Sequence, residues 1–327
     1  MTSLYVSAQG CYVSLNQQYL LVKQRGQTIA EVQLPHTEQI LIFGKSQITT
    51  QAVRACLKHN IAIVYLSRMG YCYGRLLPLE RGYRQLNRYQ QSLELVDRLL
   101  VARAIVKAKL KNCRVILQRQ YRQKELPSLV LAIETLEYLS QKTEQINSID
   151  QLMGIEGAGA SCYFSVFGDC LTGDKDFVFL TRSRRPPANP VNAMLSFGYQ
   201  VLWNHLLALI ELQGLDPYQA CLHQNSQRHA ALTSDLLEEF RAPIVDSLVI
   251  YLVNRRIVNA SDDFEYRDGG CFLNESGRKK YLKAFVQRME SSNQNQEPRW
   301  DLLMQQVKRY KQFIYNPIDG YQPYQIS

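Results

Sequence analysis

The sequence predicts an α+β protein of two domains, in which a small β-rich, β-sandwich-like N-terminal domain is followed by a larger all-α domain. Short runs of β-branched and aromatic residues, separated by turn residues, fill roughly the first eighty positions. Farther along the chain, apolar residues recur at helical spacing in much longer segments. The 327 residues, of which 46% are hydrophobic and 20% charged, suffice for two globular domains.

The N-terminal domain is predicted over residues 1–80. Its first strands are expected in five short runs, which are LYVS, CYVSLN, YLLVKQ, TIAEVQL and QILIFG. The segment TTQAVRACLKHN predicts a helix that begins after a threonine cap. Two more strands, IAIVYLS and YCYGRLLP, complete the domain, and its boundary is expected between residues 78 and 88.

Residues 81–327 are predicted to be almost entirely helical. The segment at 88–120 contains neither Gly nor Pro, and Leu126-Pro127 ends the pattern. Further helices are expected at 128–146, 191–214 and 276–291, with a last one from about Trp300. The segment RDGGC predicts a turn before the helix at 276–291.

The chain is basic, and its charge is unevenly distributed. The net charge is +9 and the isoelectric point about 9.1, which suits a polyanionic partner such as nucleic acid. Residues 81–127 hold 12 Lys and Arg against three Asp and Glu, so their excess equals that of the whole chain. Eight scattered cysteines form no CxxC motif, which excludes a zinc ribbon. We expect a cytoplasmic protein, because the sequence has no secretory signal pattern and no apolar run of about 20 residues.

Three carboxylates lie in an apolar segment a dozen residues after His223: Asp235, Glu238 and Glu239. On a helix, Asp235 lies one turn from both glutamates, and like charges at this spacing repel by about 0.2–0.5 kcal/mol. A divalent cation would compensate for this repulsion if the side chains face inward. Alternatively, they are exposed residues near a helix N-terminus, where the helix dipole favours acidic side chains.

Another carboxylate, Glu156, lies between glycines in the segment GIEGAGA. Small neighbours leave room for a ligand to approach the side chain and the backbone. The segment is no phosphate-binding loop, because no Gly-Lys-Ser/Thr follows it, and no dinucleotide fingerprint, because no strand leads into it. The alternative interpretation is a helix start whose glycines allow close packing.

Four segments occur in order along the chain: GIEGAGASCYFSVF, RSRRPPANPVNAMLSFGYQVL, GLDPYQACLH and DLLEEFRAPIVDSLVIYLVNR. Together they resemble the Cas1 family of CRISPR-associated adaptation integrases. The resemblance covers nearly the whole chain, including the basic ARAIVKAKLKN and the late FLNESGRKKYLKAF. It implies a homodimer formed largely through the N-terminal domain, and a complex with DNA and with the small ferredoxin-like partner Cas2.

The resemblance also implies a metal site at Glu156, His223 and Glu238, with Asp235 as an auxiliary acid beside it. Glu239 adjoins Glu238, and only one of the two can face an ion; Glu238 matches the family position. Two carboxylates and an imidazole suit Mg²⁺ or Mn²⁺, whereas a structural Zn²⁺ site would favour thiolates. In the family, a DNA 3′-hydroxyl attacks a phosphodiester and inserts a short fragment, the spacer, into a repeat array. With water as the attacker, the same site cleaves DNA.

Several basic residues are candidates for binding DNA. Arg182, Arg184 and Arg185 precede two prolines, and they either contact phosphates or form a solvated basic turn. Arg103 and Lys109 match basic positions of the family. The implied activity leaves two alternatives: a metal-dependent nuclease without integration, and a non-catalytic DNA-binding scaffold. A scaffold would have no reason to keep the three metal-site residues together.

Three polar residues of the segment at 191–214 are considered for a role at the site. Asn192 and Ser196 are four positions apart and either position a phosphate, support the metal site, or pair with each other. His205 lies in the apolar sequence VLWNHLLALI, which predicts a core or interface histidine instead of a metal ligand.

Overall fold

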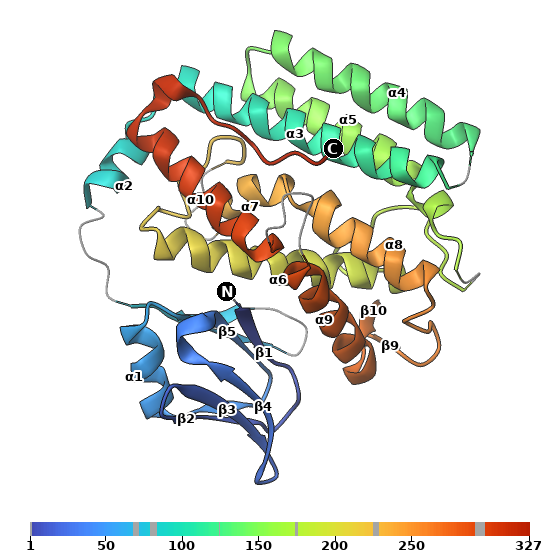
Figure 1. The fold of residues 1–327 in the computed structure, drawn as a ribbon. Helices are drawn as coiled ribbons and strands as arrows, with labels where there is room; N and C mark the ends of the chain where they lie inside the picture. Colours follow the sequence, from blue (N-terminus) through green and yellow to red (C-terminus); the bar gives the residue numbers. More distant parts are fainter. Residues whose placement is uncertain are drawn as a thin grey trace.

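The computed structural model describes residues 2–67, 72–78, 84–123, 125–173, 176–224, 229–291 and 298–327. Its N-terminal part is rich in strands and its C-terminal part is helical, as the sequence predicts (Figure 1). The helix α6 (Pro190–Leu212) runs between the N-terminal strands and most of the helices of the C-terminal part (Figure 1). This arrangement confirms the α+β class.

The N-terminal strands form two four-stranded sheets. One sheet has the order β1 (Thr2–Val6), β5 (Thr37–Phe43), β7 (Ala62–Leu66), β8 (Cys72–Leu76). The other has the order β4 (Gln27–Gln33), β3 (Tyr19–Gln24), β2 (Tyr12–Asn16), β6 (Gln47–Ile48). Val13 and Leu20 from one sheet and Ile40 and Ile63 from the other share a buried core, so the sandwich prediction is confirmed. Helix α1 (Thr50–Lys58) packs on this core and begins after Thr49, whose hydroxyl accepts the amide of Ala52 at 3.1 Å.

The middle strands of the first sheet, β5 and β7, are buried on both faces. Every residue of β5 is buried, because its side chains alternate between two cores. Ile40 and Ile42 face the second sheet, whereas Leu41 and Phe43 pack with the helices. The hydrophobic core of the helical part therefore begins inside the N-terminal part.

Nine helices of the described chain follow the strands. They are α2 (Arg84–Gln91), α3 (Leu95–Tyr121), α4 (Pro127–Lys142), α5 (Ile149–Ser165), α6, α7 (Ala231–Glu238), α8 (Ser247–Asn254), α9 (Glu275–Glu290) and α10 (Arg299–Tyr315). A π-helical segment, Arg241–Asp246, joins α7 to α8. Helix α3 packs against α4, α5 and α7, which brings three parts of the sequence together around it.

Two local predictions differ from the structure. The helix predicted at 88–120 is broken, because Glu94 adopts an extended conformation and separates α2 from α3. The C-terminal part is not purely helical, since β9 (Phe264–Arg267) and β10 (Gly270–Leu273) form an antiparallel hairpin. Asp268 and Gly269, both at positive φ, make its turn, which is typical of a two-residue hairpin loop.

Helix α6 contains a longer apolar stretch than expected, because the sequence predicted no apolar run of about 20 residues. By length and composition it could span a membrane, although the sequence suggested no such segment. However, 78% of its most apolar window is buried inside the protein. Its apolar character on all sides is therefore explained by its place in the core.

Candidate active site

The acidic segment around Asp235 forms a helix that is buried on all sides. All eight residues of α7 are buried, including Asp235 and Glu238. The alternative of exposed acidic residues is therefore wrong. Buried carboxylates need cations or hydrogen-bond donors as partners, and each of the three carboxylates of this segment has a different set.

Asp235 holds the loop that carries His223. Its Oδ2 accepts the amides of Cys221 and Leu222 at 2.7 and 2.9 Å. Its Oδ1 accepts the amide of His223 at 3.0 Å and lies 2.7 Å from Nδ1 of the same residue. When Nδ1 of His223 carries the proton and donates it in this hydrogen bond, the lone pair of Nε2 is left available for a ligand.

The electrostatics of His223 follow from the same contact. Burial alone would lower the pKa of the imidazole. The hydrogen bond and the charge of Asp235 act in the opposite direction and are stronger, so the pKa of His223 is raised. Glu238 adds to this effect, which places its charge close to the imidazole.

Glu156 and Glu238 share one ammonium group. Nζ of Lys109 on α3 contacts Oε1 of Glu156 on α5 and lies 2.6 Å from Oε2 of Glu238 on α7. Arg241 pairs with the other oxygen of Glu238 at 2.9 Å. Burial would raise the pKa of Glu238, but the charges of Arg241 and Lys109 outweigh it, so the pKa is lowered and the group is ionised.

Glu239 faces a different part of the protein. Its Oε1 accepts the hydroxyl of Tyr321, and its Oε2 accepts the amide of Tyr324 at 2.6 Å. Burial raises its pKa to about 8. Consecutive helical residues point about 100° apart, and here only Glu238 points toward Lys109 and Glu156.

The predicted metal ligands fit a divalent cation in chemistry but do not converge as a set. Among the residues that the structure describes, no three His, Cys, Asp or Glu side chains are close enough to hold a metal. Instead, the Lys109 ammonium supplies the positive charge between Glu156 and Glu238. Oε2 of Glu238 is buried and has the Lys109 ammonium beside it, and a carboxylate oxygen carries a second lone pair that could accept a cation.

The glycines beside Glu156 have two different roles. A Cβ at Gly157 would meet no atom within 4 Å, so the space next to Glu156 is open. A Cβ at Gly159 would lie 2.1 Å from Cδ2 of Leu110, so this glycine permits close packing of α5 on α3. Both interpretations of the GIEGAGA segment hold, although Glu156 lies within α5 and not at its start.

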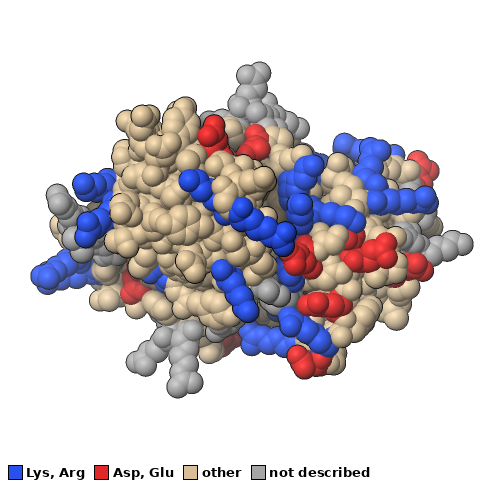
Figure 2. Space-filling view, turned by 90° about the horizontal axis from the view of Figure 1, so that it is seen from below, with Lys and Arg blue, Asp and Glu red and all other residues tan. Residues whose placement is uncertain are grey.

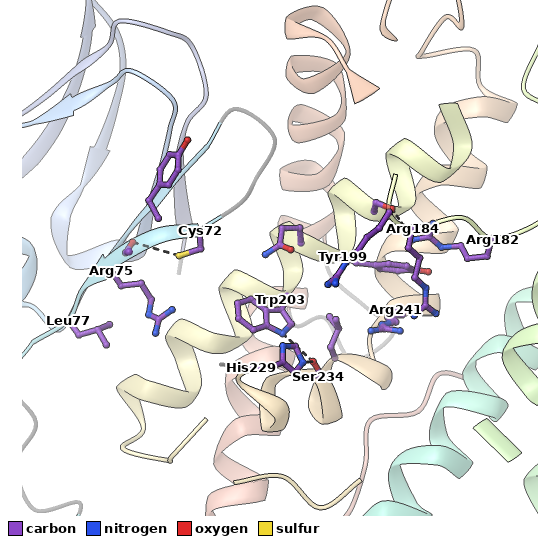
Figure 3. Close-up of a pocket in the computed structure, with 16 residues that line it drawn as sticks. Cys72, Arg75, Leu77, Arg182, Arg184, Tyr199, Trp203, His229, Ser234 and Arg241 are labelled. Carbon is purple, nitrogen blue, oxygen red and sulfur yellow. Dashed lines mark hydrogen bonds between the residues drawn. The ribbon is translucent and has the colours of Figure 1, made fainter. Parts of the chain in front are cut away.

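A cavity of about 770 Å³ is lined by Arg241, the partner of Glu238, and by residues of α6 and the basic turn (Figure 3). Five arginines line it, and no Asp or Glu among the described residues does. They are Arg75, Arg182, Arg184, Arg185 and Arg241. Its wall also contains Tyr199, Trp203 and His229, and Arg241 links the cavity to Glu238. Such a cavity suits an anion that carries aromatic groups, as a nucleotide does.

The predicted basic turn therefore lies at this cavity. Arg184 and Arg185 are exposed, whereas Arg182 is partly buried. Arg182 donates to Oδ1 of Asn192 at 2.8 Å and to Oγ of Ser196 at 3.0 Å. Asn192 and Ser196 thus hold an arginine and do not pair with each other.

Arg103 and Lys109, the two basic residues of α3 predicted to bind DNA, do not line this cavity. Arg103 donates to the carbonyl of Ile146 and to the side chain of Asn147, both at 2.7 Å. Lys109 is 6% exposed, and in this conformation its ammonium meets carboxylates instead of an open surface. On the face in Figure 2, Lys and Arg side chains run through the middle and Asp and Glu gather mainly to one side.

Four residues of the site were not predicted as such. Arg241 was missed although it follows Glu238 by three positions, the spacing of an ion pair on a helix. Tyr199 lies under Arg182 and Arg241, with its ring centre 5.5 and 5.1 Å from the two guanidinium carbons. Trp203 and His229 stack with ring centres 6.1 Å apart, a contact between distant segments that no local pattern indicates.

The comparisons with known proteins identify the family. Residues 4–287 match the family described as CRISPR associated protein Cas1. The chain belongs to the Cas1 family. It is 33% identical over 289 residues to a CRISPR-associated endonuclease Cas1 of Methanospirillum hungatei, covering 87% of this chain and 86% of the relative.

Other Cas1 relatives differ in length. The chain is 34% identical over 300 residues to a Cas4 exonuclease/Cas1 endonuclease fusion of Geobacter sulfurreducens, and the match covers 88% of this chain but only 53% of the fusion. The Cas1 structure from Thermotoga maritima superposes with a TM-score of 0.81 at 25% identity and covers all of both chains. A casposase bound to an integration product has the same TM-score at 22% identity, with 98% and 92% coverage, and shares the fold.

Proposed function

We propose that this Cas1-family protein is a CRISPR adaptation integrase, which inserts short DNA fragments into a repeat array by attack of a 3′-hydroxyl on a phosphodiester. The observation that carries the proposal is a pair of carboxylates, the buried Glu238 and the half-buried Glu156, beside a cavity lined by five arginines. A phosphodiester needs cationic contacts, and a phosphoryl-transfer site needs carboxylates for its metal.

Glu156, His223 and Glu238 would hold Mg²⁺ or Mn²⁺, and Asp235 would orient His223 from behind. When bound, such an ion stabilises the attacking and leaving oxygens of an in-line displacement. For Lys109, the proposal is a role inside the site, where its ammonium holds the two carboxylates close together.

The arginines would bind the DNA backbone. Arg184 and Arg185 are exposed at the cavity and can reach phosphates directly. Arg182 is held in one orientation by hydrogen bonds to Asn192 and Ser196. Arg103 is proposed as a peripheral contact near the start of α5. Contacts to phosphates do not depend on the base sequence, so they suit DNA fragments of any sequence.

The assembly is proposed from the family. The substrates are DNA duplexes with 3′-hydroxyl ends and CRISPR repeat DNA. The protein partner is Cas2, because a solved Cas6-RT-Cas1–Cas2 complex contains a chain similar to this one, with a TM-score of 0.72 at 25% identity. Residues 1–80 would form a homodimer, and residues 81–327 would carry the catalytic and DNA-binding functions. A cytoplasmic location is part of the same proposal.

Hydrolysis of DNA is the second candidate activity, because the relatives are called endonucleases. Strand transfer of a short duplex into a repeat-containing plasmid separates the two. We expect joined product from the wild-type protein with Cas2 and Mn²⁺ or Mg²⁺, and none from Glu156→Ala. Nicked plasmid without joined product would favour the nuclease.

The matched control is Glu134→Ala, which removes an exposed glutamate from the neighbouring helix α4. It should join DNA like the wild type. Both variants should bind DNA, because arginine contacts and not the metal dominate the affinity. Binding by the wild type without any metal-dependent chemistry would favour the scaffold and overturn the proposal.

A further inference from the structure

A segment after α10 lies across the back of the candidate active site. We call Tyr321–Ser327 the C-terminal strap; in Figure 1 it runs from the end of α10 to α3. Gln306 on α10 anchors its start, because the side-chain amide donates to the hydroxyl of Tyr321 at 2.7 Å and to the carbonyl of Gln322 at 2.9 Å. The strap thus has a fixed origin.

The strap holds the end of α7 through Glu239. Both carboxylate oxygens of this buried residue accept hydrogen bonds from the strap, one from the hydroxyl of Tyr321 and one from the amide of Tyr324. The ring of Tyr324 stacks on Phe240, with ring centres 4.9 Å apart and planes 15° apart. Two successive residues at the end of α7 are therefore held by two residues of the strap.

The strap also binds α3 through Asn112, which is fully buried. The amide nitrogen of Asn112 donates to the carbonyl of Tyr324 at 3.0 Å and to the carbonyl of Glu239 at 2.8 Å. Its amide oxygen accepts the amide of Ile326 at 2.9 Å. One side chain of α3 thus joins the strap to the end of α7.

These contacts fall directly behind the paired carboxylates. Lys109 and Asn112 are three positions apart and lie on one side of α3, where they contact Glu238 and Glu239 in turn. The carbonyl of Glu239 lies where α7 gives way to the π-helical segment, so it lacks a regular helical partner. Asn112 supplies that partner and fixes the register of α7 against α3.

We propose that the C-terminal strap is a positioning element of the active site, with Glu239 and Asn112 as positioning residues that aim Glu238 at the metal site. This inference rests on the proposed function, because it assigns Glu238 to that site. Without the strap, two buried oxygens of Glu239 lose their donors, and the end of α7 is free to rotate about its axis. A small rotation moves Glu238 away from Glu156.

The test compares Glu239→Ala, Glu239→Gln and Tyr321→Phe with the wild-type full chain. Two quantities are measured: the dissociation constant for Mn²⁺ alone by calorimetry, and kcat and KM for strand transfer with Cas2. For Glu239→Ala we expect Mn²⁺ affinity and kcat to fall about tenfold or more, with KM for DNA unchanged. Glu239→Gln should recover part of this loss, because its amide oxygen still accepts the hydroxyl of Tyr321.

Gln325→Ala is the matched control, since Gln325 is exposed and is not one of the strap residues that contact α3 or α7. It should behave like the wild type. If Glu239→Ala does not fold, Tyr321→Phe carries the test, because it removes only one hydroxyl group. Wild-type Mn²⁺ affinity and kcat in a folded Tyr321→Phe and Glu239→Ala would overturn the inference.

The outcomes also separate this inference from the proposed function. A wild-type protein that binds no Mn²⁺ and joins no DNA would refute the function, whatever the variants do. A wild type that joins DNA, together with strap variants of unchanged kcat, would refute the strap inference alone. A loss of kcat in proportion to the loss of folded protein would mean that the strap only stabilises the fold.

Discussion

The ammonium nitrogen of Lys109 lies 2.6 Å from Oε2 of Glu238 and also contacts Glu156. One positive charge therefore serves two carboxylates from different helices, of which Glu238 is buried and Glu156 half-buried. Because the charges of these two groups raise the pKa of Lys109 against the effect of its burial, the lysine remains protonated.

Replacing Lys109 by methionine should destabilise the protein mainly when metal is absent. Breaking a buried ion pair by removing one partner costs about 3–5 kcal/mol, and here two carboxylates are left to repel each other. Added Mn²⁺ should restore much of the stability, because it supplies the missing charge. Thermal unfolding of Lys109→Met in EDTA and in Mn²⁺ measures this, with the exposed Lys308→Met as control. An equal loss of stability in both buffers would contradict it.

Asp235→Asn should uncouple His223 from the site while leaving the fold intact. The oxygen of Asn can still accept the amides of Cys221 and Leu222, but its NH₂ group then faces Nδ1 of His223, reverses the tautomer and no longer accepts the amide of His223. We expect Mn²⁺ affinity to fall by about 10–100-fold, measured by calorimetry. The control is Asp262→Asn, an exposed aspartate of the loop before β9. A variant that binds Mn²⁺ as tightly as the wild type would argue against His223 as a ligand.

The double variant Arg184→Gln/Arg185→Gln should weaken DNA binding with little dependence on sequence. Each lost phosphate contact should reduce the slope of log affinity against log salt by about 1. Titrations of a labelled duplex at several salt concentrations give both the affinity for DNA and the slope of log affinity against log salt. Arg54→Gln/Lys58→Gln removes the same charge from α1 and should keep the slope. Equal slopes in both double variants would mean that net charge, and not this cavity, binds DNA.

His205 should make stability depend on pH. It is fully buried between the hydroxyl of Tyr5 and the side chain of Gln39, and burial lowers its pKa to about 3. Unfolded histidine binds a proton below about pH 6.5, so the folded state loses stability as the pH falls from 6.5 toward 3. The contribution is about 1.4 kcal/mol per pH unit within this window.

Urea unfolding between pH 7 and pH 4 checks the prediction for His205, with His205→Gln as the comparison because glutamine does not titrate. The difference in unfolding free energy between the two proteins should narrow as the pH falls. A difference that stays constant with pH would mean that His205 is not kept neutral by the fold. The same contacts confirm His205 as an interface histidine, since Tyr5 and Gln39 belong to β1 and β5.

Periodic patterns predicted most of the fold, because strands and long helices are recognised from the spacing of apolar residues along a short stretch of sequence. The break before α3 escaped prediction, since Leu93 and Glu94 are good helix formers and nothing in the identity of Glu94 requires an extended conformation. The hairpin at Asp268 and Gly269 was recognised only as a turn, because its strands are four residues each and too short for a periodic signal.

The candidate active site was predictable in part, because some of its residues are close in the sequence. Asp235 and Glu238 lie one turn apart, so their relation is local, and the resemblance to a family added Glu156 and His223. The shared ammonium of Lys109 was not predictable, because it depends on how three helices pack. The direction of Glu239 depends on residues more than 80 positions later, as the Tyr321 and Tyr324 contacts demonstrate.

The sheet that contains β5 prevents the N-terminal part and the helical part from being independent modules. Leu41 and Phe43 belong to the helical core, whereas Ile40 and Ile42 belong to the sandwich. A cut near residue 80 would therefore expose an apolar sheet face on one fragment and an uncovered α6 on the other. Recombination could not exchange the N-terminal part for an unrelated sandwich, because the replacement would need to present matching side chains to α6. The two parts are expected to unfold in one cooperative transition and to be inherited as one unit.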